Sequence, residues 1–213
     1  MKRPAPFITT AAIIAALYVV LTFLANAFGL ANYAIQVRFS EALTILPLFT
    51  PAAIPGLFIG CLLSNILTGC ILQDIIFGSL TTLVAAILTR CIGLGFKKAM
   101  KRSTSDHSKT AIGIAGTFLG SVPPIVGNML VVPFVLIYAY GFTEAGTFFG
   151  HEIPANLVYR FYVLTVGIGE LISCMILGMA VSFIMRKTGL DLKGIIRSGA
   201  SDAELKDAME QAI

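Results

Sequence analysis

Long apolar segments fill most of this sequence and restrict it to one class of protein. They cover roughly residues 7–30, 42–67, 72–96, 111–140 and 157–185. Several approach the roughly 20 apolar residues that a helix needs to cross a bilayer. Only 12% of the residues are charged, against about 25% in a soluble domain. The segments are too long and too rich in Leu, Ile, Ala and Gly for the short alternating strands of an outer-membrane barrel. The sequence therefore predicts an all-α integral membrane protein.

Basic residues between the apolar segments predict how the chain crosses the membrane. They cluster at residues 1–6, at residues 90–110 and after residue 185, whereas the other connections carry mainly acids. The positive-inside rule places all three clusters in the cytoplasm, so an even number of crossings must separate each from the next. Two apolar segments separate the second cluster from the third, but three separate the first from the second. One of these three must therefore contain two helices.

The segment 42–67 is the one that we expect to contain two helices. It contains Pro47, Pro51, Pro55 and Gly56, and proline removes a backbone donor and disfavours helix before it. We expect a short helix at 41–49 and another at 52–68. At about 1.5 Å per residue the first is too short to span a bilayer. Such a helix is tolerated where protein or a cavity covers it. The prediction is six helices with both termini cytoplasmic and a short second helix that lines a cavity.

Two polar residues lie midway along the last two apolar segments. Glu170 is the most costly residue in the chain, because an ionisable group near the bilayer midplane is expensive and usually marks a functional site. Asn128 follows Pro123 and Pro124, which free backbone carbonyl groups nearby. We take both as candidate site residues. The structural alternative is that each side chain only joins neighbouring helices.

A second polar group is expected at the outer end of the bundle. It consists of Gln36, Arg38, Glu41, Asn65 and Asp74. On a helix Arg38 and Glu41 would share a face, so an interfacial salt bridge is one interpretation. Asn65 could join two helices, and Asp74 could be an acid favoured by a helix N-terminus. The other interpretation is that these residues bind a polar ligand together with Glu170.

The sequence contains no recognisable metal or nucleotide site. Its four cysteines have neither metal-ligand nor redox spacing and are expected to be packing residues: Cys61, Cys70, Cys91 and Cys174. There is no glycine-rich phosphate loop with its lysine. We expect no metal, no cofactor and no ATP hydrolysis by this chain.

The two ends of the chain carry weaker signals. Two small-xxx-small pairs in the first apolar segment, Ala11 with Ala15 and Ala12 with Ala16, allow close approach of another helix, either within the bundle or from a partner. We divide the chain into a membrane domain, residues 1–188, and a cytoplasmic tail, residues 189–213. The tail contains a capping-box pattern that predicts a short amphipathic helix.

Five sequence blocks stand out: QVRFSEAL at 36–43, LPLFTP at 46–51, IPGLFIGCLLSN at 54–65, DIIFGSL at 74–80 and GIGEL at 167–171. Together they resemble the QueT family, the substrate-binding S components of energy-coupling-factor (ECF) vitamin transporters. The resemblance covers most of residues 8–186 and implies the six-helix S-component fold. It implies uptake of a queuosine precursor across a prokaryotic plasma membrane, with 7-aminomethyl-7-deazaguanine as the first candidate and queuine as an alternative. The implied partners are a transmembrane coupling subunit and two ATPases.

The resemblance also implies roles for individual residues. In S components the alanine-rich part of the first helix docks on the coupling subunit, which makes the four alanines named above contact candidates. We expect Glu170 or Glu41 to accept the donors of the guanine-like edge, and the other acid or Asp74 to hold the cationic aminomethyl group. Arg38 would donate to the ring carbonyl or orient Glu41.

The remaining residues would complete the pocket. Gln36, Asn65 and Asn128 supply further polar contacts, and Phe39 and Tyr33 could stack on the bicyclic ring. The loop 30–41 would close over the captured ligand. Two alternatives stay open at this point: an S component for another vitamin, and a membrane-embedded enzyme that uses Glu170 with a histidine or cysteine. Against the enzyme, neither histidine lies at helix depth and no nucleophile–base pair is evident.

Overall fold

The computed structural model describes residues 5–30, 36–141, 147–148 and 151–187. Tyr33 and the predicted tail, residues 189–213, lie outside these ranges. In chain order the helices are α1 (Ala5–Ala27), η1 (Phe39–Leu48), α2 (Ala53–Leu67), α3 (Leu72–Arg102), α4 (Asp106–Tyr138), η2 (Ala155–Leu157), α5 (Val158–Glu170), η3 (Leu171–Leu177) and α6 (Gly178–Lys187). Between α4 and η2, the two-residue strands β1 (Thr147–Phe148) and β2 (His151–Glu152) pair antiparallel.

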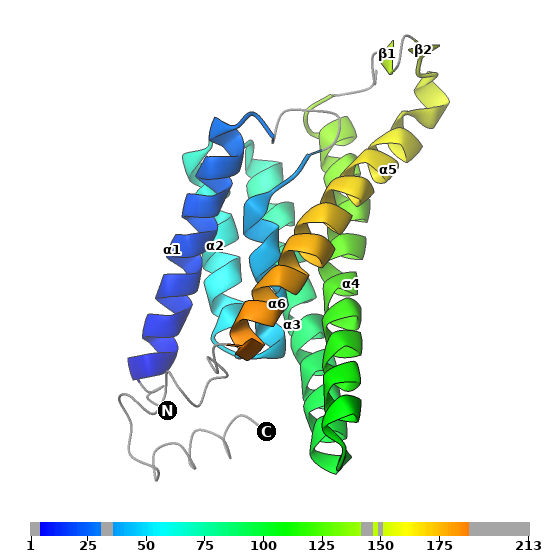
Figure 1. The fold of residues 1–213 in the computed structure, drawn as a ribbon. Helices are drawn as coiled ribbons and strands as arrows, with labels where there is room; N and C mark the ends of the chain where they lie inside the picture. The colour runs from blue at the N-terminus through cyan, green and yellow to red at the C-terminus, as the bar shows by residue number, and fades with distance from the viewer. Residues whose placement is uncertain (1–4, 31–35, 142–146, 149–150, 188–213) are drawn as a thin grey trace.

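Four helical segments of the described chain are long and apolar enough to cross a membrane: Phe7–Ala27, Leu72–Arg102, His107–Tyr138 and Ala155–Lys187. The helices η1 and α2 are apolar but shorter. The chain is therefore a multi-pass helical membrane protein, as the sequence predicts (Figure 1). The number of complete crossings and the side on which the termini lie stay predictions.

The proline-rich segment 42–67 contains two helices, as predicted. The first, η1, ends at Leu48, and α2 begins at Ala53, each within a residue of the expected boundary. In the turn between them, the Thr50 Oγ1 accepts a hydrogen bond of 3.2 Å from the backbone N–H of Ala52. The ten residues of η1 form a 3₁₀ helix, which rises about 2.0 Å per residue. Its length of roughly 20 Å is well short of the ~30 Å hydrocarbon core.

The basic connection between the apolar segments 72–96 and 111–140 is almost wholly helical, so the helices extend beyond the apolar segments. Helix α3 continues to Arg102 and α4 starts at Asp106. Lysine and arginine are good helix formers, and near a helix C-terminus they interact favourably with its dipole. The end of an apolar run is therefore not the end of the helix. Figure 1 places this connection at the same end of the bundle as the start of α1 and the end of α6, in agreement with a shared side for the basic clusters.

Helix α1 packs closely on α2 through small residues. A Cβ added to Gly56 would lie 2.8 Å from the Ala11 carbonyl oxygen, and one added to Gly60 would lie 3.1 Å from the Ala15 Cα. Both alanines are buried. Backbones approach this closely only where side chains are small. Two of the four alanines predicted as partner contacts therefore lie in internal packing.

The opposite face of α1 is open. Ala12 and Ala16 are exposed there, and the neighbouring Ile13 and Leu17 are about half exposed. An apolar face of this kind lies against lipid or against another protein. Only this pair of alanines is available on the described surface for contact with a partner.

The short helix η1 lies among the other helices and contacts α1, α2, α3, α4, η3 and α6. Its residues from Ser40 to Pro47 are buried. At its C-terminal end, Arg90 of α3 donates from Nη1 to the carbonyl oxygens of Pro47 (3.3 Å) and Leu48 (3.4 Å). Carbonyl groups at a helix C-terminus have no partner within the helix, so Arg90 supplies the hydrogen-bond donors that the last carbonyl groups of η1 lack.

The last long segment is one continuous helix with a change of geometry at its centre. Helix α5 ends at Glu170, the seven residues of η3 form a π-helix, and α6 follows directly. Short π-helical insertions often occur at functional sites, because they re-aim the side chains around them. Here the insertion begins immediately after the most costly acid of the sequence.

Candidate functional site

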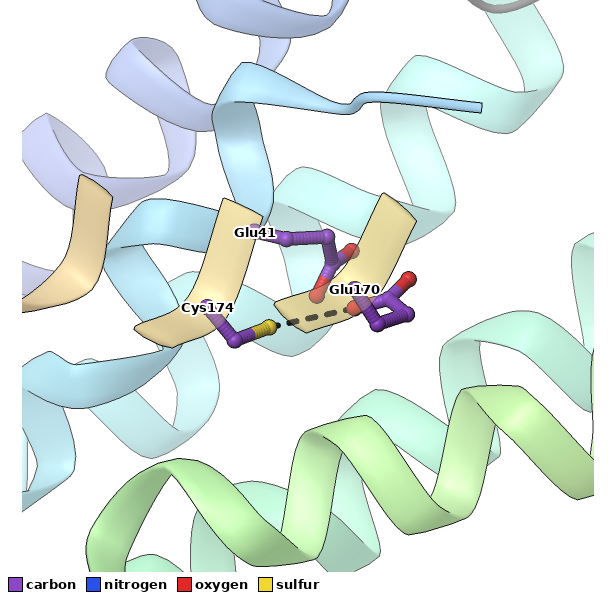
Figure 2. Close-up of side chains that lie close together, drawn as sticks. All are labelled: Glu41, Glu170 and Cys174. Atoms are coloured by element: carbon purple, nitrogen blue, oxygen red, sulfur yellow. Dashed lines mark hydrogen bonds between the residues drawn. The ribbon is translucent and has the colours of Figure 1, made fainter. Parts of the chain in front are cut away.

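Two glutamates that are far apart in the sequence meet inside the bundle. Glu41 comes from η1 and Glu170 from the end of α5, and both point toward Cys174 of η3 (Figure 2). One ligand atom of each side chain, a carboxylate oxygen or the sulfur, lies within 4.8 Å of the others. The exposed fraction is 1% for Glu41 and 5% for Glu170. The predicted convergence of these two acids is therefore present in the fold.

Only one oxygen of Glu41 is satisfied by protein. The Tyr18 hydroxyl of α1 donates to Oε1 over 2.5 Å. The other oxygen, Oε2, has no hydrogen-bond partner among the described residues, nor has the neighbouring Ser40 Oγ. A buried polar atom without a partner is costly, and such atoms in native proteins call for an explanation such as a ligand or water. This oxygen is therefore a buried acceptor that no described residue satisfies.

Glu170 is held by neighbours on two sides. Asn128 of α4 donates from Nδ2 to Oε1 (3.0 Å), and the Cys174 thiol donates to Oε2 (3.1 Å). The Thr44 hydroxyl of η1 lies 3.5 Å from the same sulfur. Asn128 of α4 and Cys174 of η3 therefore fix the orientation of this carboxylate.

The segment before η1 crosses α5 and brings Arg38 to the site. The Gln36 carbonyl oxygen lies against Gly169, where any Cβ would clash with it. The backbone N–H of Arg38 donates to Ser173 Oγ at 3.1 Å. The negative charges of Asp74, Glu41 and Glu170 stabilise the guanidinium of Arg38. Arg38 is thus linked electrostatically to the glutamate pair and to a second acid, Asp74.

That second acid belongs to a polar cluster at the ends of α2, α3 and α4. The Tyr140 hydroxyl donates to Asp74 Oδ2 and accepts from the Ile71 backbone N–H, both at 3.3 Å. A Cβ added to Gly78 would lie 3.2 Å from Asn65 Nδ2 and 3.6 Å from Asp74 Oδ1. Burial raises the pKa of Tyr140 to about 12, so the hydroxyl keeps its proton and remains the donor to Asp74.

The other predicted site residues lie near these clusters without a described contact to a carboxylate. The Phe39 ring packs edge-on against Phe28, with ring centroids 6.3 Å apart. Gln36 is half-buried. The predicted stacking partner Tyr33 lies outside the described residues. A stacking role for either aromatic ring stays a prediction.

Sequence reasoning missed three residues that shape the site: Tyr18, Thr44 and Cys174. A tyrosine hydroxyl inside an apolar helix needs a hydrogen-bond partner, and this could have drawn attention to Tyr18. Cys174 follows Glu170 by four residues, the spacing of one helical face, but it was assigned to packing. Thr44 carries no such signal, because threonine in a helix usually bonds to its own backbone.

The donor set of two carboxylates and one thiol could also accept a divalent cation such as Zn²⁺. The sequence spacing did not indicate this, because the donors come from two distant segments. The expectation of no metal stays a prediction.

Two cavities of the described structure lie elsewhere. A groove of about 630 Å³ between α3 and α4 is lined by apolar side chains such as Leu80, Val84 and Val122. A hollow of about 380 Å³ lies beside Cys91 and Phe96. Neither includes a glutamate. The segment 36–38 lies against α5 and η3, and both glutamates are buried.

Comparison with models of protein families gives a match over most of the chain. The family model described as QueT transporter matches residues 8–187, the part of the chain that contains every site residue described above. No curated protein and no solved structure matches.

Proposed function

Because the chain belongs to the QueT transporter family, we propose that it is the substrate-binding subunit of an ECF importer. Its cargo is a queuosine precursor, 7-aminomethyl-7-deazaguanine, captured from outside a prokaryotic cell. The family is one of transporters, so the chain is not an enzyme. The observation that carries the proposal is the buried meeting of Glu41 and Glu170, with one carboxylate oxygen unpartnered.

The candidate site has two acidic poles, which suits the two polar ends of this cargo. One pole is the pair Glu41 and Glu170, and the other is Asp74 with Asn65, while Arg38 acts on the acids of both. The cargo carries ring N–H and exocyclic amine donors beside a carbonyl, and a cationic aminomethyl group. Carboxylates accept such donors in charge-assisted bonds, and a guanidinium can donate to the carbonyl.

Capture requires an opening at the segment 36–38, part of the loop predicted to close over the ligand. The seating of Gln36 on Gly169 and of Arg38 on Ser173 supports this role, because these contacts enclose the glutamates in the described state. We propose that the segment lifts to admit cargo and then returns. Release inward follows reorientation or opening of the loaded subunit on its partner.

The proposed partners are a transmembrane coupling subunit and two ATPases, in the plasma membrane. We propose six membrane helices with both termini cytoplasmic, supported by the gathering of the α1 start, the α3–α4 connection and the α6 end at one end of the bundle (Figure 1). The open α1 face with Ala12 and Ala16 is the proposed contact with the coupling subunit.

Calorimetric titration of the purified subunit in detergent with 7-aminomethyl-7-deazaguanine tests the cargo and the site together. We expect tight binding by the wild-type chain. Each of Glu41→Gln and Glu170→Gln should weaken it about 100-fold, because a charged hydrogen-bond partner contributes roughly 1.5–3 kcal/mol. The control Asp106→Asn, at the first residue of α4, should bind as the wild type does. Unchanged affinity in both glutamate variants would show that Glu41 and Glu170 do not bind the cargo.

Uptake into vesicles tests the dependence on partners. The chain alone should bind cargo without accumulating it, and accumulation should appear when the coupling subunit, the ATPases and ATP are present. Concentration of cargo against a gradient by the chain alone would contradict the proposal.

A further inference from the structure

The groove of about 630 Å³ between α3 and α4 fits a hydrocarbon chain. Of the side chains that line it, only Thr81 has a polar atom, and its hydroxyl donates to the Phe77 carbonyl oxygen of the same helix at 2.7 Å. The groove therefore offers a ligand no free polar side chain. The side chains of Val84, Leu88 and Val126 on its walls are about half exposed, so the groove is open at the surface of the bundle.

The smaller hollow continues this groove along α3 toward the basic connection. The two share Ile92 and Leu119 as lining residues. Within the hollow, a Cβ added to Gly95 would meet open space. Together the groove and the hollow extend along α3 from Phe77 to Ala99, which is roughly 33 Å at about 1.5 Å per residue. This length matches the ~30 Å hydrocarbon core of a bilayer, so the end at Ala99 lies near a membrane surface.

Two basic side chains lie where the groove ends. Lys98 follows Gly95 by three residues, so the two share a helix face. Arg102 has the same spacing from Ala99, and both basic side chains are exposed. They belong to the connection 90–110, which carries six basic residues and one acid. Clusters of this kind beside membrane helices bind anionic lipid headgroups. The apolar groove and the cations at its end therefore complement the two parts of an anionic phospholipid.

We propose that α3 and α4 bind an anionic phospholipid of the surrounding bilayer. One acyl chain lies in the groove, and Lys98 and Arg102 hold the phosphate, to which a guanidinium can donate two parallel hydrogen bonds. A zwitterionic phospholipid with the same chains carries no net negative charge, so it binds more weakly. This inference goes beyond the proposed function and does not depend on the cargo, because it requires only that both helices lie in the membrane.

Titration of the full chain in detergent with phosphatidylglycerol, followed by native mass spectrometry, tests the headgroup contact. Lys98→Gln combined with Arg102→Gln should weaken binding about 30-fold, because each basic residue near a membrane surface contributes about 5-fold to the attraction of an anionic lipid. The control Lys97→Gln with Lys101→Gln removes the same charge from the far side of α3, since each lies two positions, or about 200°, beyond a groove residue. It should bind within a few fold of the wild type. Equal losses in the two double variants, or equally tight binding of phosphatidylcholine by the wild type, overturn the proposal.

Fluorescence quenching tests the place of the acyl chain, because the chain contains no tryptophan and a single introduced indole reports on its own surroundings. Leu88→Trp puts the indole in the groove, and the matched control Ile87→Trp puts it one residue away, at a similarly exposed position outside the groove. In phosphatidylcholine vesicles that contain a small share of brominated phosphatidylglycerol, Leu88→Trp should be quenched well beyond that share and Ile87→Trp in proportion to it.

A second variant blocks the groove itself. Gly95→Leu fills the open space of the hollow, so adding it to the Leu88→Trp protein should remove the excess quenching. Equal quenching at the two tryptophan positions would show bulk lipid only and overturn the site. Quenching of Leu88→Trp by neither lipid, in a protein that runs as a dimer, would show a second copy of the chain in the groove and would also overturn it.

Discussion

The two ends of η1 differ in how their polar groups are satisfied. At the C-terminal end, Arg90 donates to the carbonyls of Pro47 and Leu48, and a Cβ added to Gly93 would lie 2.8 Å from the Leu48 backbone. At the N-terminal end, Ser40 Oγ and Glu41 Oε2 have no partner among the described residues. The same short helix is thus completed by protein at one end and left incomplete at the other.

The difference in hydrogen bonding suggests that the two ends of η1 have different roles, one in stability and one in binding. Polar atoms buried for structural reasons are paired, because the cost of leaving them unpaired falls entirely on stability. Atoms left unpaired weaken the empty protein and strengthen its complex with a ligand. We therefore expect substitutions at the N-terminal end to change binding and substitutions at the C-terminal end to change stability.

The largest effect is expected where the segment 36–38 rests on α5. Gly169→Ala places a Cβ against the Gln36 carbonyl oxygen, which displaces the segment that brings Arg38 to the site. We expect about a 100-fold loss of affinity for 7-aminomethyl-7-deazaguanine, equivalent to roughly 2.8 kcal/mol, measured by calorimetry. The matched control is Gly167→Ala, whose Cβ meets only the flexible Met129 side chain, at 2.9 Å from its sulfur. Equal losses in both variants would show that the segment has no special part in binding.

A smaller effect, on stability, is expected at the other end of η1. Gly93→Ala forces a Cβ against the Leu48 backbone, and overpacking of this kind costs typically 1–3 kcal/mol. The thermal unfolding midpoint in detergent should fall, while the affinity of the protein that remains folded is kept. On the same helix, a Cβ at Gly95 meets open space, and Gly95→Ala should be neutral or slightly stabilising, because alanine favours helix. If Gly93→Ala weakened binding without changing the midpoint, the division between the two ends would be wrong.

The smallest effect is expected at Tyr18. Tyr18→Phe removes the hydrogen bond to Glu41 Oε1 and leaves that carboxylate with a second unpartnered oxygen. We expect a loss of about 1–2 kcal/mol in stability and a change of affinity of only a few fold, since the ring itself remains. Tyr138→Phe is the control, because Tyr138 is 73% exposed. If Tyr18→Phe left the free energy of unfolding unchanged, this hydrogen bond would not contribute to stability.

Some features of the site could be predicted because they depend on the free-energy cost of placing a polar group in an apolar helix. That cost does not depend on how the helices are arranged. An acid at the centre of an apolar helix is expensive wherever its neighbours lie, so Glu170 could be identified from its position alone. That Glu41 and Glu170 serve one site was also expected, but the contacts that hold them could not be predicted, because they depend on the π-helical insertion η3 and on the depth of η1. Tyr18 and Cys174 were missed for the same reason: their side chains acquire a role only from neighbours on other helices.

The amino-acid sequence by itself determined that this is a helical membrane protein, that its second apolar segment is broken by prolines, and which family it resembles. These follow from properties that act along the chain, namely hydropathy, the missing N–H of proline and the order of residues in motifs. Only the tertiary structure decided which alanines of α1 stay on the surface, that the basic connection is helical, and which side chains hold Glu41 and Glu170 in their buried site. Those outcomes depend on distances between helices, and a distance of that kind is set by how complete side chains pack in three dimensions.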